Sequence, residues 1–431
     1  MTEQIAASID AEEERTPDQL APVAALGNRI ASLDFIRGLA VMGILWANIV
    51  AFGQPFSAYM WPEAFLTPHG EVSNWMWIVQ FVLIDGKMRG LFTLLFGAGL
   101  YLFMEKAWER GATRWLQVRR LFWLLLFGIV HFYLIWRGDI LMLYSFAGFV
   151  ALAFLRMSPK RQMVLGILGY LAGAVLYGAF MGPAYFLTQA DPETQPELAQ
   201  AGEGYEAAKA EALADDALER PIMTDGSYAD FVQHNFTEHL TDPLFMLFIF
   251  GFETLPLMLM GMALYRWGLF DGRMNLSKQR MWGWIGLIGG TLLTVPMALW
   301  AKSTGFDYWA NTAAFMAFSH LPRLPVVLGL AAILALVGMK ASGWLAERIS
   351  AAGRAAFTNY LGTSVLMMLV FHPWAGGLWG DLTRPGLYVV MLATWAVMLA
   401  WSKPWLDRYR YGPLEWLWRC LTYGRLFPLK R

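Results

Sequence analysis

The sequence has little cysteine and little charge. Its 431 residues include a single cysteine, Cys420, which excludes a disulfide framework and a thiolate metal site. Charged residues make up 15% of the chain, whereas a soluble protein carries about a quarter. The net charge is zero and no basic patch with interleaved aromatic residues occurs, so nucleic acid is not an expected partner.

What the sequence does contain is a series of apolar segments. Hydrophobic residues make up 57% of the chain, and they are concentrated in segments of about twenty residues, the length that crosses a bilayer. We therefore predict an all-α, polytopic membrane helix bundle with about ten transmembrane helices, surrounded by membrane lipids. The predicted spans are 35–54, 78–104, 116–136, 139–156, 161–181, 245–267, 281–301, 323–339, 354–372 and 385–407.

Two segments depart from a simple span. The second predicted span is too long for one straight crossing and contains a charged cluster. An interfacial piece, Asn74–Leu83, followed by a span from about Gly86, accounts for its length. A further amphipathic piece, Leu414–Tyr423, is expected to lie on the membrane surface.

Lysine and arginine are distributed unevenly between the two sides of these spans. Segments on the N-terminal side hold 24 of them and the opposite segments hold 6. Because cytoplasmic loops carry the excess of basic residues, both termini are predicted to be cytoplasmic. Residues 1–30 are polar and acidic without a basic n-region, so we expect a disordered cytoplasmic tail and no cleaved signal peptide.

One large loop, 183–243, separates two predicted five-span halves, 31–182 and 244–431. The loop carries 13 acidic residues against Lys209 and Arg220, which disfavours an anionic soluble substrate on that side. We interpret it as an outward-facing solvated cap, with a lid over an outward-facing pocket as the alternative. No sequence repeat relates the two halves, so an inverted-repeat transporter is not supported.

The charged cluster in the second span is the first candidate for a site. A charge inside hydrocarbon costs at least about 2.5–3.5 kcal/mol, so such residues usually face the bundle interior or water. Asp85 and Arg89 are four residues apart and share one face if this piece is helical. Lys87 makes the cluster net positive and requires an anion, a carbonyl or water. We expect these residues to form a wall of a central pocket.

The first span carries a second polar pair. Arg37 and Asn48 are eleven residues apart, which places them on one helix face with Asn48 about 16 Å deeper. Such a seam suits a long anionic cofactor with a polar tail. The alternatives are that Arg37 pairs with Asp34 or reaches the surface, and that Asn48 bonds a neighbouring helix.

His131 is the best candidate for a general base, because it lies inside a span without a flanking loop signal. Asp139 stands at the start of the following helix and is its expected partner. The alternatives are a helix-capping role for Asp139 and a bond from His131 to a backbone carbonyl. No two metal ligands have the spacing of a metal site on one helix, so no metal centre is expected.

The second half offers three further candidates for substrate or cofactor binding. Glu253 is an acid close to a proline inside a span, and Arg354 stands at the cytoplasmic mouth of another. Asn359 follows Thr358, and both can form hydrogen bonds between helices. For Thr358 this structural role is the favoured interpretation.

Several of these motifs, in this order, resemble one bacterial family. They are Leu33–Gly38 with Asn48, Asp85–Arg89 with Leu94–Gly99, His131 with Trp136–Leu141, Leu259–Arg266, Gly353–Tyr360 and Gly412–Trp416. The chain after residue 29 resembles YeiB-like bacterial membrane proteins, and its second half resembles their companion domain of unknown function. The resemblance implies a multi-pass protein of the bacterial cytoplasmic (inner) membrane.

The first helix is also similar to that of transmembrane acyltransferases, including the lysosomal heparan-glucosaminide N-acetyltransferase and bacterial sugar O-acyltransferases. This resemblance implies transfer of an acyl group from cytosolic acyl-CoA to an acceptor across the membrane. In the bacterial O-acyltransferases a histidine stands eleven residues after the helix-one arginine. Here that position is Asn48, so His131 replaces that histidine on chemical grounds alone.

The leading hypothesis is therefore acyl transfer, with acyl-CoA as co-substrate and no tightly bound cofactor. The residues assigned to the CoA phosphates are Arg37, Lys87, Arg89 and Arg354. Asn48 would bond the pantetheine amides, and His131, polarised by Asp139, would deprotonate an outward-facing hydroxyl or amine.

Two other hypotheses are retained. The second is a transporter or lipid-handling protein in which Asp85, Glu253 and the basic residues line a substrate path. The third is a scaffold in which the buried charges only join helices. In either of the first two cases the substrate is a small molecule, lipid or glycan, and a homo-oligomer is compatible with the sequence.

Overall fold

The computed structural model describes residues 30–431, and every regular element in this range is a helix. The predicted all-α class is therefore confirmed. The disordered tail predicted for residues 1–30 lies, up to residue 29, outside the described residues.

The helices follow the predicted spans closely. The first half contains α2 (Ala31–Gly53), η3 (Phe56–Tyr59), η4 (Pro62–Ala64), α3 (Glu71–Leu83), α4 (Lys87–Trp108), α5 (Arg114–Leu134), α6 (Leu141–Ala151), η5 (Leu152–Phe154) and α7 (Pro159–Met181). The large loop contains α8 (Ala184–Thr188), α9 (Pro196–Asp225) and α10 (Tyr228–Thr237). The second half contains α11 (Asp242–Arg266), α12 (Leu276–Ser303), α13 (Tyr308–Thr312), the π-helix η6 (Ala313–Phe318), α14 (His320–Gly338), α15 (Trp344–Arg354), α16 (Ala356–Phe371), α17 (Arg384–Arg408) and α18 (Pro413–Tyr423).

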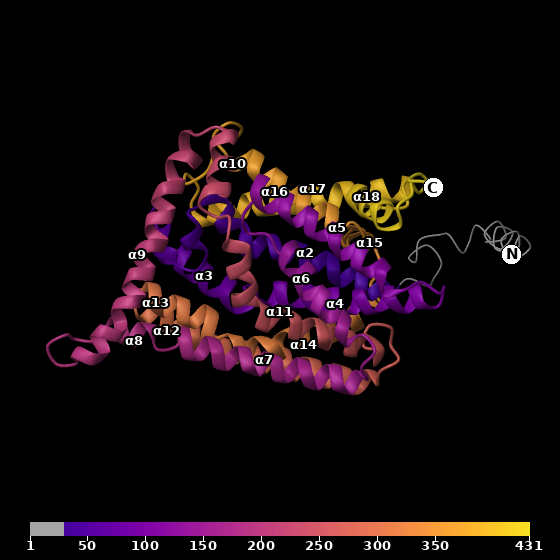
Figure 1. Ribbon diagram of the computed structural model, residues 1–431, viewed down its shortest axis with the longest axis horizontal. Helices are drawn as coiled ribbons and strands as arrows, with labels where there is room; N and C mark the ends of the chain where they lie inside the picture. The colour runs from indigo at the N-terminus through magenta and orange to yellow at the C-terminus, as the bar shows by residue number, and fades with distance from the viewer. Residues whose placement is uncertain (1–29) are drawn as a thin grey trace, which may run out of the picture.

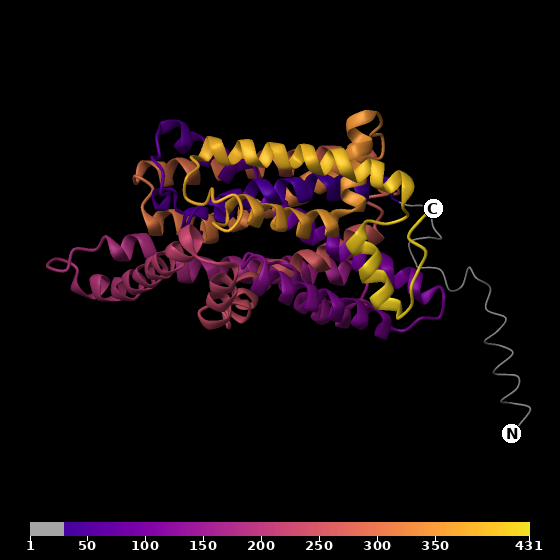
Figure 2. The same cartoon turned by 90° about the horizontal axis from the view of Figure 1, so that it is seen from above.

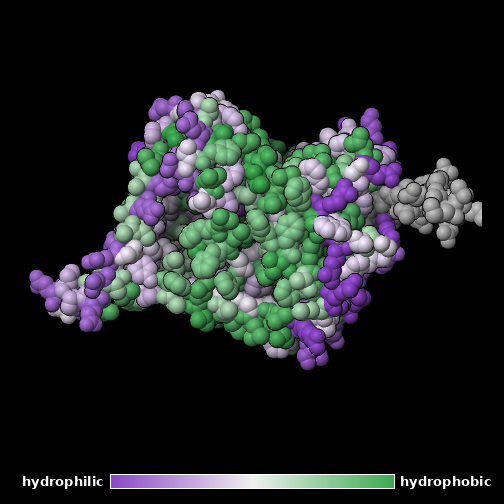
Figure 3. Space-filling view, in the orientation of Figure 1, coloured by the Kyte–Doolittle hydropathy of each residue, from purple (hydrophilic) through white to green (hydrophobic). Residues whose placement is uncertain are grey.

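Many of these helices have the character of membrane spans. Within residues 30–431, seven are long and apolar enough to cross a bilayer, namely α2, α5, α7 continued by α8, α11, α12, α14 and α17. The other three predicted spans coincide with α4, with α6 and η5, and with α16. A broad hydrophobic band lies between hydrophilic ends (Figure 3). The chain is thus a membrane-like helical protein, while the number of crossings and the cytoplasmic termini stay predictions.

The bundle has two distinct ends. Helices α8 and α9 lie at one end, which we call the loop side, and α18 and the C-terminus lie at the other, which we call the terminal side (Figures 1 and 2). α9 runs across the ends of the long helices in Figure 1. Their lengths, with 1.5 Å rise per residue, separate the two sides by roughly the thickness of a bilayer.

Helix α2 lies at the centre of the bundle, where it contacts α4, α14, α15, α16 and α17. Glycines allow the closest of these approaches. A side chain at Gly38 would overlap the carbonyl of Ile349 in α15, and one at Gly353 would overlap the carbonyl of Asp34 in α2. Because α15 approaches α2 so closely here, Arg354 is placed beside the polar start of α2.

The expected interruption of the second span is present. Helix α3 ends at Leu83, Gly86 adopts a positive φ of 71°, and α4 begins at Lys87. A left-handed residue cannot continue a right-handed helix, and glycine takes this conformation without the clash of a Cβ atom. The helix expected near the C-terminus is also present as α18, while its position on the membrane surface stays a prediction.

The large loop is helical and docks on the loop side of the bundle. Tyr205 in α9 donates to the Phe180 carbonyl at 2.6 Å, and Tyr228 in α10 donates to the Leu134 carbonyl at 2.9 Å. Asp216 in α9 accepts a hydrogen bond from the Ser57 hydroxyl. Helix α11 of the second half packs against α4, α6 and α7 of the first half, so the two halves share a core. The division into two halves and a cap stays a prediction.

The contact between α4 and α11 generates a first prediction. A methyl group at Gly261 would overlap the Leu94 carbonyl of α4, whereas one at Gly251, on the same helix, would meet no atom within 4 Å. We expect Gly261→Ala to destabilise the protein by about 1–3 kcal/mol through overpacking. Gly251→Ala gains helix propensity, up to about 1 kcal/mol, and serves as the control.

Thermal unfolding of both variants in one detergent checks this expectation. The midpoint of Gly261→Ala should fall below that of the parent protein, and the midpoint of Gly251→Ala should equal or exceed it. A Gly261→Ala midpoint that matches the control would show that α4 and α11 do not pack this closely.

Candidate functional site

A cavity of about 300 Å³ opens on the terminal side, which is within the size range of ligand pockets. We call it the basic cavity, because six cationic side chains line it against two carboxylates. The cations are Arg37, Lys106, Arg120, Arg354, Arg410 and Arg419, and the carboxylates are Asp34 and Glu415. Such an excess of positive charge at the mouth attracts an anion.

Two elements fix the mouth of the basic cavity. Arg37 pairs with Asp34 at 3.5 Å on the first turns of α2. Glu415 of α18 accepts from the backbone N–H groups of Phe357 and Thr358, at 2.7 and 3.1 Å, and so satisfies the start of α16. The Thr358 hydroxyl also donates to Glu415 at 2.6 Å, which gives Thr358 the structural contact expected for it.

The inner part of the basic cavity is lined by apolar and aromatic residues. Phe92, Phe96 and Leu95 of α4 face Leu124 and Leu141, and the cavity also reaches Tyr144 and Tyr360. A charged mouth with an apolar interior suits an elongated ligand that has an anionic head and a less polar tail.

His131 and Asp139 lie beside this inner end. The His131 Nδ1 atom is 2.7 Å from Asp139 Oδ1, and both side chains are fully buried. The Tyr360 ring, which lines the basic cavity, lies 5.2 Å from the His131 ring. The contact expected between His131 and Asp139 is therefore present. In the alternative interpretation His131 donates to a backbone carbonyl, but here the carboxylate takes that place.

The geometry of the pair determines the tautomer of the neutral imidazole. An ionised carboxylate only accepts, so Asp139 holds the proton on Nδ1 and leaves a lone pair on Nε2. Nε2 is buried and has no hydrogen-bond partner within residues 30–431. Asp139 Oδ2 accepts from the Met142 N–H at the start of α6 at 2.8 Å. One carboxylate therefore satisfies a helix N-terminus and also orients His131. The catalytic role of both residues stays a prediction.

Two smaller cavities continue from Tyr360 toward the loop side. The inner one, of about 10 Å³, is lined by Asn48, Trp136 and Tyr360 among others. The loop-side one, of about 20 Å³, is lined by Phe52, Trp136 and Arg137 among others. Phe52 and Trp136 line both, and their rings stack with centroids 3.9 Å apart. Asn48 thus lies beyond Tyr360, near the position expected from its depth on α2.

The charged cluster of the second span is arranged differently from the prediction. Arg89 does not pair with Asp85; its Nη2 atom lies 3.0 Å from Oε2 of Glu253 in α11. Arg323 of α14 binds the same carboxylate oxygen at 2.7 Å. The shared face of Asp85 and Arg89 required a continuous helix, and Gly86 interrupts the helix between them. The partner of Arg89, Glu253, comes from a distant part of the sequence.

Lys87 and Asp85 are also held by protein groups. The Lys87 ammonium is fully buried and donates to the Phe81 carbonyl at 2.5 Å. Asp85 accepts from Gln80 at 3.0 Å. None of the cluster residues lines the basic cavity, so Lys87 and Arg89 are not part of its cationic mouth. Tyr144 separates the two regions, with its hydroxyl 3.4 Å from the Arg89 carbonyl.

Asn359 also lies away from the basic cavity. It donates to the Ala352 carbonyl at 3.0 Å and to Ser402 at 3.1 Å, and it accepts from Trp401 at 2.9 Å. These bonds join α15, α16 and α17, which corresponds to the helix-bonding alternative rather than to a binding role.

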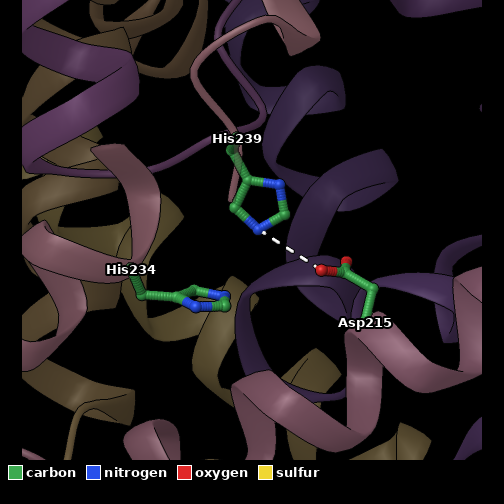
Figure 4. Close-up of side chains that lie close together, drawn as sticks. All are labelled: Asp215, His234 and His239. Carbon is green, nitrogen blue, oxygen red and sulfur yellow. Dashed lines mark ion pairs between the residues drawn. The ribbon is translucent and has the colours of Figure 1, made fainter. Parts of the chain in front are cut away.

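A group on the loop side was not found from the sequence. Asp215 of α9, His234 of α10 and His239 from the turn before α11 offer ligand atoms within 4.8 Å of one another. Figure 4 shows these three side chains close together. They come from three separate segments, so a search for ligand spacing on single helices does not detect them. The available signal was a pair of histidines, His234 and His239, only five residues apart.

Arg137 joins this group to the His131 region. Its guanidinium lies 2.9 Å from Asp215 Oδ2 and 2.7 Å from Glu219 Oε2. Burial disfavours the charged guanidinium, but the two carboxylates outweigh it and raise the pKa of Arg137. Burial raises the pKa of the Glu219 carboxyl, while Arg137 opposes that shift. This ion-pair group connects α9 to the link between α5 and α6.

Comparison with known proteins gives a family without a described activity. A family described as "Protein of unknown function (DUF418)" matches residues 264–425. The uncharacterized protein YxaH of Bacillus subtilis (strain 168) is 29% identical over 94% of this chain and 96% of its own length. The uncharacterized protein YeiB of Escherichia coli (strain K12) is 29% identical over 93% and 98%. No solved structure matches the chain.

The Glu253 ion pairs generate a second prediction. Replacement of Glu253 by Gln leaves the buried Arg323 and the partly buried Arg89 without their carboxylate. Breaking a buried pair in this way costs about 3–5 kcal/mol. We expect a clear fall in the thermal midpoint of Glu253→Gln. Glu109→Gln, which breaks an exposed pair with Lys106, is the matched control and should change the midpoint little. Equal midpoints for the two variants would contradict the buried network.

Proposed function

We propose that this protein transfers an acyl group from cytosolic acyl-CoA to an outward-facing acceptor. The chain belongs to the YeiB-like family, and the compared relatives state no activity. The proposal therefore rests on the geometry of the chain itself. The basic cavity, with its inner end against the buried His131–Asp139 pair, carries this proposal. We place the protein in a bacterial inner membrane with the terminal side in the cytoplasm, in agreement with the lysine and arginine distribution.

The mouth of the basic cavity suits the nucleotide end of the co-substrate. Arg37 from α2 and Arg354 from α15 line it together with the arginines of α18 and the chain before it. Arginine binds phosphate through paired N–H donors, which makes it well suited to the phosphates of CoA. Lys87 and Arg89, which were assigned to the phosphates from sequence, are dropped from this role because they lie outside the cavity.

The apolar interior suits the arm that carries the thioester. A chain entering between Phe92 and Phe96 would pass Tyr144 and reach Tyr360. Tyr360 lines both the basic cavity and the inner cavity. Once its ring moves aside, the thioester would reach His131 and the inner cavity. There the Asn48 amide would bond the end of the pantetheine arm.

The chemical step is general-base catalysis by His131. Nε2 accepts the proton of an acceptor hydroxyl or amine as the acceptor's oxygen or nitrogen bonds to the thioester carbon. The carbon–sulfur bond breaks, and the imidazolium gives this proton to the CoA thiolate. Asp139 holds the ring and stabilises its positive charge during the step. The acceptor, a small molecule, lipid or glycan, would enter from the loop side past Phe52 and Trp136.

A transporter or lipid-handling function is the second candidate, and one observation favours it. The buried Glu253 and Arg323, with the partly buried Arg89, lie beside η6, a π-helix. π-Helical turns are frequent at functional sites. Arg323 donates to the Phe315 carbonyl within this π-helix at 2.8 Å. In this function the buried charges, rather than His131, would contact the substrate.

Binding of acyl-CoA is the third prediction. Titration of the purified chain with acetyl-CoA by calorimetry should show saturable binding. Arg37→Ala and Arg354→Ala should each weaken it about 10–100-fold, because a hydrogen bond to a charged group contributes about 1.5–3 kcal/mol. Arg161→Gln, an exposed arginine of α7 outside the cavity, is the control. Absence of saturable binding with any acyl-CoA would refute the proposed function.

Separation of binding from transfer is the fourth prediction. His131→Ala should lower the rate of thioester consumption about 10²–10⁴-fold, the usual contribution of a positioned base. Asp139→Asn should also lower this rate, and both variants should keep the acetyl-CoA affinity of the parent protein.

Reconstituted vesicles distinguish the second candidate in the same variants. Substrate flux that persists in His131→Ala but stops in a folded Glu253→Gln protein would favour transport over acyl transfer.

A further inference from the structure

The Asp215, His234 and His239 side chains on the loop side form a group that neither the proposed acyl transfer nor the family description uses. His234 and His239 are 7% and 4% exposed, and their rings meet at 83° with centroids 5.0 Å apart. Asp215 Oδ1 lies 3.5 Å from His239 Nε2. We propose that these three side chains bind a divalent transition-metal ion of the zinc type.

The donor atoms suit such an ion. Zinc binds imidazole nitrogen at about 2.0–2.1 Å and carboxylate oxygen at about 2.0–2.2 Å. Two ligands at these distances and a tetrahedral angle lie about 3.4 Å apart, close to the 3.5 Å between Asp215 Oδ1 and His239 Nε2. All three ligand atoms lie within 4.8 Å of one another, so a small movement of the His234 ring completes the set.

His234 points independently to a missing ligand. Its Nε2 atom is buried and has no hydrogen-bond partner within residues 30–431. A buried polar atom without a partner costs about 1–3 kcal/mol, so such atoms are rare in native proteins. In Figure 4 the nitrogen-bearing edge of this ring faces Asp215. A metal ion between them would satisfy the atom.

The surroundings of His239 also match those of a metal ligand. The His239 Nδ1 atom lies 2.9 Å from Asp242 Oδ2, so the carboxylate holds the proton on Nδ1 and Nε2 presents its lone pair. A carboxylate behind a histidine in this way orients most histidine ligands of zinc. The lone pair of Nε2 currently accepts from Arg137 Nη1 at 3.0 Å.

Arg137 is compatible with the ion but competes with it. Its Nη1 bonds Asp215 through Oδ2, whereas the oxygen nearest to His239 is Oδ1, so the ion and the arginine use different oxygens. Only the contact from Arg137 to His239 must be given up. Asp215 and Glu219 bind the Arg137 guanidinium, and Asp242 binds His239. Against the single positive charge of Arg137, these three carboxylates leave two negative charges, which equal the charge of a divalent ion.

The bound ion would fasten the cap. Its three ligands come from α9, α10 and the turn before α11. Arg137 lies two residues from Asp139, on the link between α5 and α6. The Asp215 side chain is 32% exposed, which leaves a path for the ion and a position for a water ligand. This inference is independent of acyl transfer, because it concerns residues outside the basic cavity.

Zinc titration of the full chain tests the proposal. After treatment with a chelator, the detergent-solubilised protein is titrated with Zn²⁺ by calorimetry, and the visible spectrum of added Co²⁺ reports histidine coordination. We expect one ion per chain and a zinc-dependent rise in thermal midpoint. His234→Gln and His239→Gln should lose more affinity than Asp242→Asn, for which the loss should be about 10–100-fold.

Two further variants make the result specific. Arg137→Gln should increase zinc affinity, because it removes the competing cation. His69→Gln changes a histidine outside the group and should bind zinc like the parent protein. Absence of stoichiometric zinc in the parent protein, or equal affinity in the parent, His234→Gln and His239→Gln, would overturn the proposal and leave the group as an ion-pair network.

Discussion

The shared carboxylate of Glu253 illustrates the constraint on which this structure depends. Inside an apolar bundle, each charged side chain must find its partner within the protein, because lipid offers none. Glu253 of α11 therefore receives Arg89 of α4 and Arg323 of α14, at 3.0 and 2.7 Å. These bonds join three helices that are far apart in sequence. The glycine contacts between α4 and α11 bring the helices close enough for such pairing.

The same constraint divides the polar residues into separate groups. In the Glu253 network both guanidinium groups are paired with the shared carboxylate, whereas the arginines of the basic cavity outnumber the carboxylates there. Between these groups, His131 is held by Asp139 with Nε2 lacking a partner within the described residues. A group whose charged side chains are held by buried ion pairs between helices stabilises the fold. A group with excess charge, or with an unused lone pair, is the better candidate for binding and chemistry.

Local signals in the sequence predicted much of this arrangement. Apolar segment lengths indicated the helices, and the interruption at Gly86 followed from the length of the second span. His131 and Asp139, eight residues apart across one link, were correctly expected to meet. Asp85 and Arg89 do not share a helix face, because the continuous helix that this arrangement required is interrupted at Gly86. Glu253 beside Arg89, Trp401 and Ser402 beside Asn359, and Asp215 near His234 come from distant segments, and no local spacing reports such contacts.

The central claim is that the basic cavity delivers a thioester to His131. A density map of the protein with a non-transferable thioether analogue of acetyl-CoA tests it most directly. The claim predicts phosphates between Arg37 and Arg354, a displaced Tyr360 ring, and the acyl carbon about 3–3.5 Å from His131 Nε2. An analogue bound outside the cavity, or one whose acyl end stays on the terminal side of an undisplaced Tyr360, would contradict it.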